Sequence, residues 1–156
     1  MRPKTILITG CSSGIGLDAA RALHRAGWRV FATCRRQVDC DRLEVEGLES
    51  FPLDYADEAS VARAAAETLR RAGGTLDALF NNGAYAIPAP LEDVPRDAMR
   101  AIFETNVLGW HDLTRRLLPA LRASGDGRVV NCSSVLGMVS LRYRGPYNAT
   151  KFAIEG

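Results

Sequence analysis

Short β-branched apolar runs alternate along the chain with longer stretches of helical periodicity. This alternation is typical of parallel strands joined by crossover helices, so it predicts an α/β fold. Within each short run most successive positions are apolar, which is typical of a parallel strand that is buried on both faces. The predicted strands lie at 4–9, 29–34, 48–53, 77–81 and 128–132.

Three helices are predicted between these strands, at 15–26, 58–72 and 96–123. Glycine follows each of them, at positions 27, 73, 74 and 125. Glycine suits the left-handed backbone conformation that commonly closes a helix. Pro119 lies inside the third helix and is expected to kink it, because proline lacks the amide hydrogen and collides with the preceding turn. A further helix is expected to begin near Pro146.

Composition and charge exclude several classes of protein. The 156 residues are 47% apolar and 24% charged, which is ordinary for one soluble domain. A net charge of +2 is too small for non-specific electrostatic binding to nucleic acid or anionic lipid. The apolar runs are much shorter than the roughly 20 residues of a membrane span, and the N-terminus lacks a signal-peptide pattern. We therefore expect no nucleic-acid or membrane partner.

The cysteines add to this interpretation. Cys11, Cys34, Cys40 and Cys132 are spread without the spacing of zinc ligands or of a disulfide framework. We expect reduced thiols with packing roles, no metal site and a cytoplasmic protein.

A glycine-rich turn, Thr-Gly-Cys-Ser-Ser-Gly-Ile-Gly at 9–16, follows the first predicted strand and opens the first helix. Small residues let a backbone approach a pyrophosphate, and the helix directs its free N–H groups and positive dipole end toward that anion. Glycines also serve ordinary turns, but a strand before and a helix after favour a dinucleotide site. The residues predicted to bind a cofactor here are Gly10, Ser12, Ser13, Gly14, Ile15 and Gly16.

The second predicted strand ends in two arginines, Arg35 and Arg36. A dinucleotide fold that binds NAD normally has an acidic residue at this point, where it accepts hydrogen bonds from the adenosine ribose. Guanidinium groups are instead suited to a 2′-phosphate. The pair therefore favours NADP over NAD, although either arginine can also be a solvated surface charge.

Ser134, Tyr147 and Lys151 form a second group, with Asn106 upstream in the third predicted helix. Tyrosine and lysine four residues apart share one face of a helix. A phenol has an ordinary pKa near 10 and transfers protons poorly at neutral pH until a nearby cation stabilises the phenolate. Lys151 can supply that cation, although such a pair also occurs by chance in many helices.

Together these residues resemble the short-chain dehydrogenase/reductase family, in its Tyr-x-x-x-Lys branch, over essentially the whole chain. The matching motifs are the turn at 9–16, Asp54, Asn81-Asn82-Gly83-Ala84, Asn106, Ser133-Ser134-Val135-Leu136-Gly137 and Tyr147-Asn148-Ala149-Thr150-Lys151. The resemblance implies a Rossmann-type doubly wound parallel sheet of about five strands, incomplete at the C-terminus, in a single dinucleotide-binding domain over 1–156. It also implies an NADP-dependent oxidoreductase acting on an aldehyde, a ketone, a steroid-like compound or the corresponding alcohol.

The resemblance also implies a role for each catalytic candidate. Tyr147 would be the general acid in carbonyl reduction and the general base in alcohol oxidation. Ser134 would hydrogen-bond the substrate oxygen. Lys151 would lower the pKa of Tyr147 and bind the nicotinamide ribose, and Asn106 would hold a water that links Lys151 to solvent. Tyr147 and Lys151 would thus also belong to the cofactor site.

For the adenosine, the resemblance implies that Asp54 accepts from the adenine amino group and that the region of Asn82 and Gly83 packs against the nucleoside. The family usually has Asn-Asn-Ala-Gly where this chain has Asn-Asn-Gly-Ala. We expect the turn beneath the cofactor to be altered and binding to be retained. Tyr55 stands where small or apolar residues are common in the family, and it is expected to be structural.

Members of the family run to about 250 residues, the size of a large α/β domain, whereas this sequence ends at Gly156. On that basis we expect two strands and the walls of the substrate pocket to be missing, the fifth strand to be an edge, and the isolated chain to have at most a trace of turnover. The resemblance implies a homo-oligomer at full length. Two alternatives stay open, a non-catalytic nucleotide-binding module or pseudoenzyme, and a subunit completed by another chain.

Overall fold

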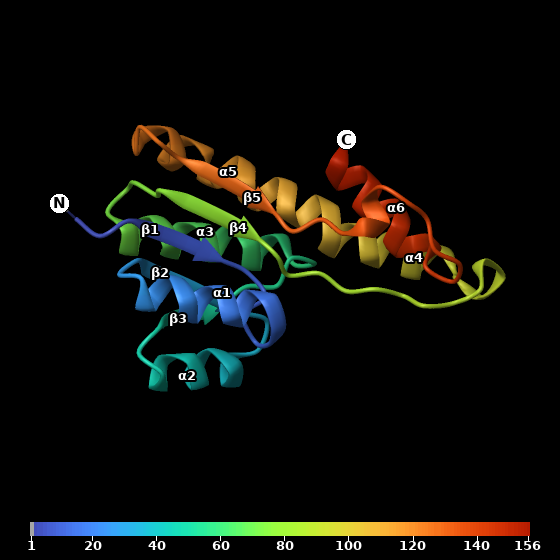
Figure 1. Ribbon diagram of the computed structural model, residues 1–156, viewed down its shortest axis with the longest axis horizontal. Helices are drawn as coiled ribbons and strands as arrows, with labels where there is room; N and C mark the ends of the chain where they lie inside the picture. The colour runs from blue at the N-terminus through green and yellow to red at the C-terminus, as the bar shows by residue number, and fades with distance from the viewer. Residues whose placement is uncertain (1) are drawn as a thin grey trace.

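Five parallel strands form one sheet in the computed structural model, which describes residues 2–156. The strands are β1 (Thr5–Ile8), β2 (Arg29–Cys34), β3 (Glu49–Pro52), β4 (Ala78–Asn81) and β5 (Arg128–Asn131). Their order is β3-β2-β1-β4-β5, with β1 at the centre (Figure 1). The chain therefore builds outward on one side of β1 and then crosses to the other, which is the order of a doubly wound sheet. All five predicted strands are present, and the α/β prediction is confirmed.

Six α-helices accompany the sheet. They are α1 (Gly14–Arg25), α2 (Gln37–Val45), α3 (Glu58–Ala72), α4 (Arg96–Phe103), α5 (Gly109–Ala123) and α6 (Gly145–Glu155). The sequence did not predict α2, because no capping Ser, Thr, Asp or Asn precedes it and its apolar residues are few. Its N-cap is Arg36, and it buries little besides Cys40 and Leu43. Tertiary packing rather than a strong local signal stabilises this helix.

The helix predicted at 96–123 is interrupted. A π-helical turn, η2 (Glu104–Leu108), separates α4 from α5, and the Gly109 N–H donates to the Glu104 carbonyl across it. In contrast, α5 runs through Pro119 as far as Ala123. The interruption thus lies at the turn that carries Asn106, and π-turns of this kind are frequent at functional sites.

Helices cover the two faces of the sheet separately. On one face α3 and α5 pack on Leu7, Phe31 and Leu79. On the other, α1 and α2 pack on neighbouring strand residues such as Ile6 and Val30. Successive strand residues alternate between the two clusters because side chains alternate across a strand. Together they form the two cores of a three-layer domain.

The carboxyl end of the sheet carries the remaining elements. Two short helices, η1 (Leu91–Asp93) and η3 (Val135–Gly137), lie in the segments that follow β4 and β5. Figure 1 shows α4 and α6 beyond this end of the sheet, where α6 packs against η3, α4 and η2. Within residues 2–156, no helix combines the length and the apolar character needed to cross a membrane.

β5 differs from the other strands in burial. It lies at an edge of the sheet, and all four of its residues are exposed. The sequence predicted apolar burial on both faces of each strand, which is wrong for β5, and it also predicted that the fifth strand is an edge, which is confirmed. In the described residues β5 pairs only with β4 and contributes to neither core, so its apolar side chains reach solvent.

Candidate functional site

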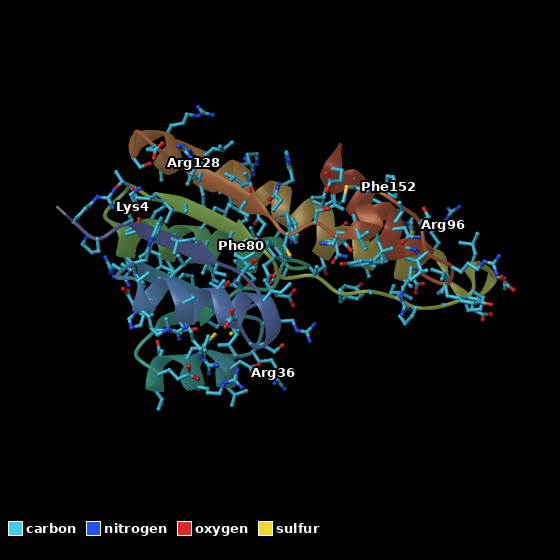
Figure 2. The ribbon with its side chains drawn as sticks, viewed as in Figure 1. Lys4, Arg36, Phe80, Arg96, Arg128 and Phe152 are labelled. Carbon is cyan, nitrogen blue, oxygen red and sulfur yellow. The ribbon has the colours of Figure 1, made fainter. Side chains whose placement is uncertain are left out.

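A cleft of about 540 Å³ lies at the carboxyl ends of β1 to β4, the edge at which doubly wound sheets bind ligands. Its walls are formed by Gly10, Ser12, Arg35, Arg36, Asp39, Leu53, Asp54, Tyr55, Ala56, Gly83, Ala84, Tyr85, Ala101 and Thr105. Six of the residues predicted to bind the cofactor are among them. Figure 2 shows Arg36 beside α2, Phe152 on α6, and the end of β4 at Phe80 between them. The cleft therefore begins at α2 and extends toward the elements around α6.

The glycine turn fits an anionic ligand sterically. Gly10 has a φ of 70°, and a Cβ there would lie 2.6 Å from the Gly83 Cα. Only glycine allows the turns after β1 and β4 to approach so closely. α1 begins at Gly14, and among the described residues the Ser13 side chain makes no capping hydrogen bond to its first turn. The helix N-terminus therefore keeps N–H donors for a phosphate group.

The two predicted arginines both line the cleft, but their environments differ. Both side chains are exposed, but Arg36 donates to Asp39 at 2.8 Å, whereas Arg35 makes no side-chain hydrogen bond within residues 2–156. Arg42 lies 4.0 Å from Asp39, and it donates to the Ser12 carbonyl in the glycine turn at 2.6 Å. The hydrogen bond from Arg36 keeps the pKa of the Asp39 carboxyl below its ordinary value. The cleft thus carries a carboxylate that is already paired with arginine.

Sequence reasoning did not identify Asp39, because α2 was not predicted. The available signal was the spacing of Arg36, Asp39 and Arg42, which are three residues apart and so lie on one face of a helix.

The turn after β4 is held from below by Thr9. The Thr9 Oγ1 accepts the N–H groups of Asn82 at 2.9 Å and of Gly83 at 3.1 Å. The Asn82 side chain donates in turn to the Thr9 carbonyl at 3.0 Å. Asn82 thus supports the glycine turn, and its side chain does not line the cleft, whereas Gly83 does.

Tyr55 explains the altered order of small residues in this turn. Its hydroxyl lies 2.9 Å from Thr9 Oγ1 and 2.8 Å from Asn81 Oδ1. A Cβ on Gly83 would lie 3.3 Å from its ring, closer than side chains normally pack. The tyrosine ring therefore occupies space beside Gly83 that an alanine methyl would need. Burial raises the pKa of the Tyr55 phenol far above its ordinary value, so it is a neutral structural group that also forms part of the wall.

Asp54, the predicted adenine partner, is part of the cleft wall and half-buried. Its Oδ1 accepts the N–H of Ala56 at 3.0 Å, which fixes the orientation of the carboxylate. Its backbone N–H is bonded to the Ser60 hydroxyl, so the turn between β3 and α3 is held at both ends. Asp54 can therefore present a preoriented acceptor to the cleft.

Ser134 is the N-cap of η3, and its Oγ accepts the N–H of Leu136 at 3.1 Å. Its hydroxyl proton remains free to donate to a substrate oxygen. Within residues 2–156 the neighbouring Ser133 hydroxyl is buried and has no hydrogen-bond partner.

Tyr147 and Lys151 lie on one face of α6, as predicted. The Lys151 Nζ lies 5.5 Å from the centroid of the Tyr147 ring and donates to the Cys132 carbonyl at 2.6 Å. Lys151 is 2% exposed, whereas Tyr147 is half-buried. Burial lowers the pKa of the Lys151 ammonium, and the neighbouring Cys132 acts in the opposite direction. The pair combines a buried cation with a phenol that reaches toward solvent.

Asn106 lies in the π-turn and is fully buried. Its amide donates to the Tyr85 carbonyl at 2.8 Å and to Thr150 Oγ1 at 3.2 Å, and its Oδ1 accepts the Tyr85 N–H at 3.1 Å. Both side-chain N–H donors are therefore used in tying the segment after β4 to α6. A water held by Asn106, as the resemblance implies, must use its remaining acceptors.

The predicted catalytic residues do not line the cleft itself. They lie beyond its end, on η2, η3 and α6, and the cleft reaches this group through Tyr85 and Thr105, which sequence reasoning missed. Thr105 is next to Asn106, and Tyr85 is bonded to it. The buried Asn106 therefore connects the cleft wall at Tyr85 to α6, the helix that carries Tyr147 and Lys151.

The cysteines lie apart from this chemistry. All four are free thiols, and Cys11, Cys34 and Cys40 are buried. Burial raises the pKa of Cys34 to about 12, so its thiol is unreactive near neutral pH. Residues 2–156 contain no group of three or more side chains that could hold a metal ion.

Comparison with known proteins agrees with this geometry. The family model described as short chain dehydrogenase matches residues 4–156. The uncharacterized oxidoreductase YbbO of Escherichia coli strain K12 is 43% identical over 152 residues, which are 97% of this chain and 56% of YbbO. Human retinol dehydrogenase 8 is 35% identical over 164 residues, covering 99% of this chain and 51% of the enzyme.

A solved structure shows the same fold. The crystal structure of a short-chain dehydrogenase from Streptomyces avermitilis superposes with a TM-score of 0.94 and 37% identity, covering 99% of this chain and 58% of that chain. The chain spans about half the length of the curated relatives it matches. Sequence and fold agree over nearly all of its residues, and the chain therefore belongs to the short-chain dehydrogenase family.

Proposed function

We propose that this chain is the cofactor-binding and catalytic portion of an NADP-dependent oxidoreductase that interconverts a carbonyl compound and its alcohol. In this proposal residues 1–156 are one dinucleotide-binding domain. The observation that carries it is the Tyr147–Lys151 pair, a half-buried phenol with a buried ammonium 5.5 Å from its ring. The cleft that ends beside this pair supplies the place for a nucleotide.

The proton chemistry follows from this pair. In this proposal the positive charge of Lys151, 5.5 Å from the Tyr147 ring, would interact with the negative charge that develops on the substrate and tyrosine oxygens during proton transfer. In carbonyl reduction Tyr147 would deliver its proton to the substrate oxygen while Ser134 donates a hydrogen bond to the same atom. When bound, the nicotinamide cofactor supplies or accepts the hydride. In the oxidative direction Tyr147 would take the proton back.

The specificity for NADP rests on the charges at the start of the cleft. Arg35 is exposed on its wall, and its guanidinium is suited to a 2′-phosphate. Arg36 is already paired with Asp39, so in our proposal Arg35 contributes the larger part of the preference. Asp39, with arginines on both sides, is a less available partner for the ribose hydroxyls of NAD.

We propose an apolar aldehyde, ketone or steroid-like compound as the substrate. The segment between η3 and α6 exposes Met138, Val139, Leu141 and Tyr143 next to the catalytic residues. Such an apolar surface suits a substrate that is itself apolar. The name of retinol dehydrogenase 8 gives an apolar alcohol as the substrate of that relative. A homo-oligomer and a cytoplasmic location, the latter in line with the free thiols, complete the proposal.

The test is a comparison of NADPH and NADH binding by the chain, measured by isothermal titration calorimetry. We expect tighter binding of NADPH, and Arg35→Asp should abolish the preference. Tyr147→Phe should abolish turnover of an apolar aldehyde by the protein, because the variant has no phenolic proton to transfer. Equal affinities in the unaltered chain would remove the specificity claim, and turnover that survives Tyr147→Phe would remove the catalytic one.

A further inference from the structure

Trp110 lies between the two halves of the proposed site. It is the second residue of α5, immediately after the π-turn, and it is 2% exposed. A buried indole in the core of a domain ordinarily serves packing. Packing accounts for its position in the core of α3 and α5, but not for its two polar contacts.

The edge of the indole contacts the nucleotide-binding turn. The Trp110 Nε1 donates a hydrogen bond to the Gly83 carbonyl at 2.8 Å. Gly83 lines the cleft, and its N–H is bonded to Thr9. The peptide groups of this residue are therefore fixed from both sides, by the hydroxyl of Thr9, which follows β1, and by the indole of α5.

The face of the same indole contacts the proton-transfer pair. The Lys151 Nζ lies 4.6 Å from the centroid of the Trp110 ring, within the range of a cation–π interaction. The Tyr147 ring lies 5.5 Å from the same nitrogen, and the Cys132 carbonyl accepts its hydrogen bond. The buried ammonium is thus held between two aromatic rings and one carbonyl. Among the described residues, the Tyr147 phenol and the Cys132 thiol are the titratable groups that face it.

The indole is itself held in place. The Tyr55 ring packs against it with centroids 6.3 Å apart, and the Tyr55 hydroxyl is bonded to Thr9 and Asn81. A buried aromatic side chain with this support keeps one orientation, because neighbouring atoms exclude its other rotamers.

From these contacts we propose that Trp110 is a positioning residue that holds the Lys151 ammonium at its ring face and the Gly83 carbonyl at its ring edge. It thereby couples the nucleotide-binding turn to the proton-transfer pair. This inference rests on the proposed function, because it assigns Trp110 a role toward Lys151 and toward the cofactor.

The lysine content of the chain allows a direct test of the ring face. Lys4 and Lys151 are its only lysines, so an NMR spectrum of lysine labelled at the ε-carbon contains two signals. The Lys151 methylene protons should be displaced upfield by the indole. Replacement of tryptophan by 5,6,7-trifluorotryptophan weakens the negative face of the ring and keeps its N–H. The pKa of Lys151 should then fall by about half a unit to one unit, because the ammonium loses part of its stabilisation.

The ring edge is tested by Trp110→Phe, which keeps an aromatic face and removes the N–H donor. We expect the Kd of the chain for NADPH to rise about 3-fold to 10-fold, the effect of one hydrogen bond. The Lys151 signal should stay upfield. Trp110→Leu removes both contacts and should abolish the upfield displacement, but the fluorinated chain decides the ring face if that variant does not fold.

Trp28 supplies a matched control, because Lys4 lies over its ring at 5.8 Å, and Figure 2 shows Lys4 at the opposite end of the molecule from Phe152 of α6. Trp28→Leu should change neither the Lys151 signal nor the Kd for NADPH. The inference is wrong if fluorination leaves the pKa of Lys151 unchanged, or if Trp110→Phe binds NADPH as tightly as the unaltered chain. Failure of the unaltered chain to bind NADPH would instead overturn the proposed function.

Discussion

β1 and β5 are both four-residue parallel strands rich in β-branched residues, yet they lie in opposite environments. In β1 every residue is buried, and Leu7 and Ile8 are completely inaccessible. In β5 Val129 and Val130 are 39% and 51% exposed. The difference comes from their neighbours, since β1 has a strand on each side and helices on both faces, whereas β5 pairs only with β4 in the described residues.

The comparison shows that strand formation and strand burial have different causes. The local sequence favours extended backbone in both segments, because β-branched side chains suit a pleated surface. Stabilisation depends instead on the apolar area removed from water, which the surrounding elements decide. We therefore expect the buried region around β1 to contribute most to the stability of the fold and the β5 edge to contribute little.

Shortening one side chain in each strand should expose this difference most strongly. Leu7→Ala should lower the free energy of unfolding by about 2–5 kcal/mol, because it leaves a cavity in the core under α3 and α5. Val130→Ala should lower it by less than about 1 kcal/mol, because half of that side chain is already in water. Urea denaturation followed by circular dichroism measures both. Similar losses in the two variants would contradict the comparison.

A chain of side-chain hydrogen bonds crosses the sheet, and removing one of its members should have an intermediate effect on the free energy of unfolding. From β1 to β5 the link runs through Thr9, Tyr55, Asn81 and Asn131. Tyr55→Phe leaves the Asn81 Oδ1 without its donor in a buried site, and should cost about 1–3 kcal/mol of stability. Asn131→Ala, at the exposed end of the same link, is the control and should cost less in the same denaturation experiment. A larger loss from Asn131→Ala would mean that β5, not β1, anchors the link.

The smallest expected effect is on the pH dependence of stability, through a carboxylate at the amino end of β1. The Asp77 carboxylate accepts the N–H and the hydroxyl of Thr5 and pairs with Arg2. Burial raises the pKa of this carboxyl, but those hydrogen bonds outweigh it and leave the pKa below its ordinary value. Its contribution is therefore present above the unfolded pKa of about 4 and is lost as the pH falls through the lower folded value.

The variant Asp77→Asn tests whether the Asp77 carboxylate stabilises the fold above about pH 4 and loses this effect in acid. At neutral pH the variant should be less stable by about 1 kcal/mol, the scale of one hydrogen bond. The gap between the two proteins should narrow in thermal melts as the pH falls below about 4. A gap that widens in acid would show that the carboxylate is unfavourable in the folded protein.

Much of the candidate site was predictable because many of its residues are close together in the sequence. The turn at 9–16 leads directly into α1, and Tyr147 and Lys151 are four residues apart in α6. Local spacing therefore predicts both arrangements. Asp39 was missed because its helix has no strong local signal, and Trp110 because a buried indole usually means packing alone. Its contacts with Gly83 and Lys151 join residues that are 27 and 41 positions away.

The sequence by itself determined the α/β class and the five strands, and it supplied the candidate residues of the site, because each of these depends on local periodicity or on side-chain type. Only the tertiary structure decided that β5 is exposed along its whole length, where the long helix is interrupted, and that the indole of Trp110 contacts both the turn at Gly83 and the buried ammonium of Lys151. These features depend on elements that are distant in the chain but packed together, and dense packing fixes their geometry in a way that no single segment specifies.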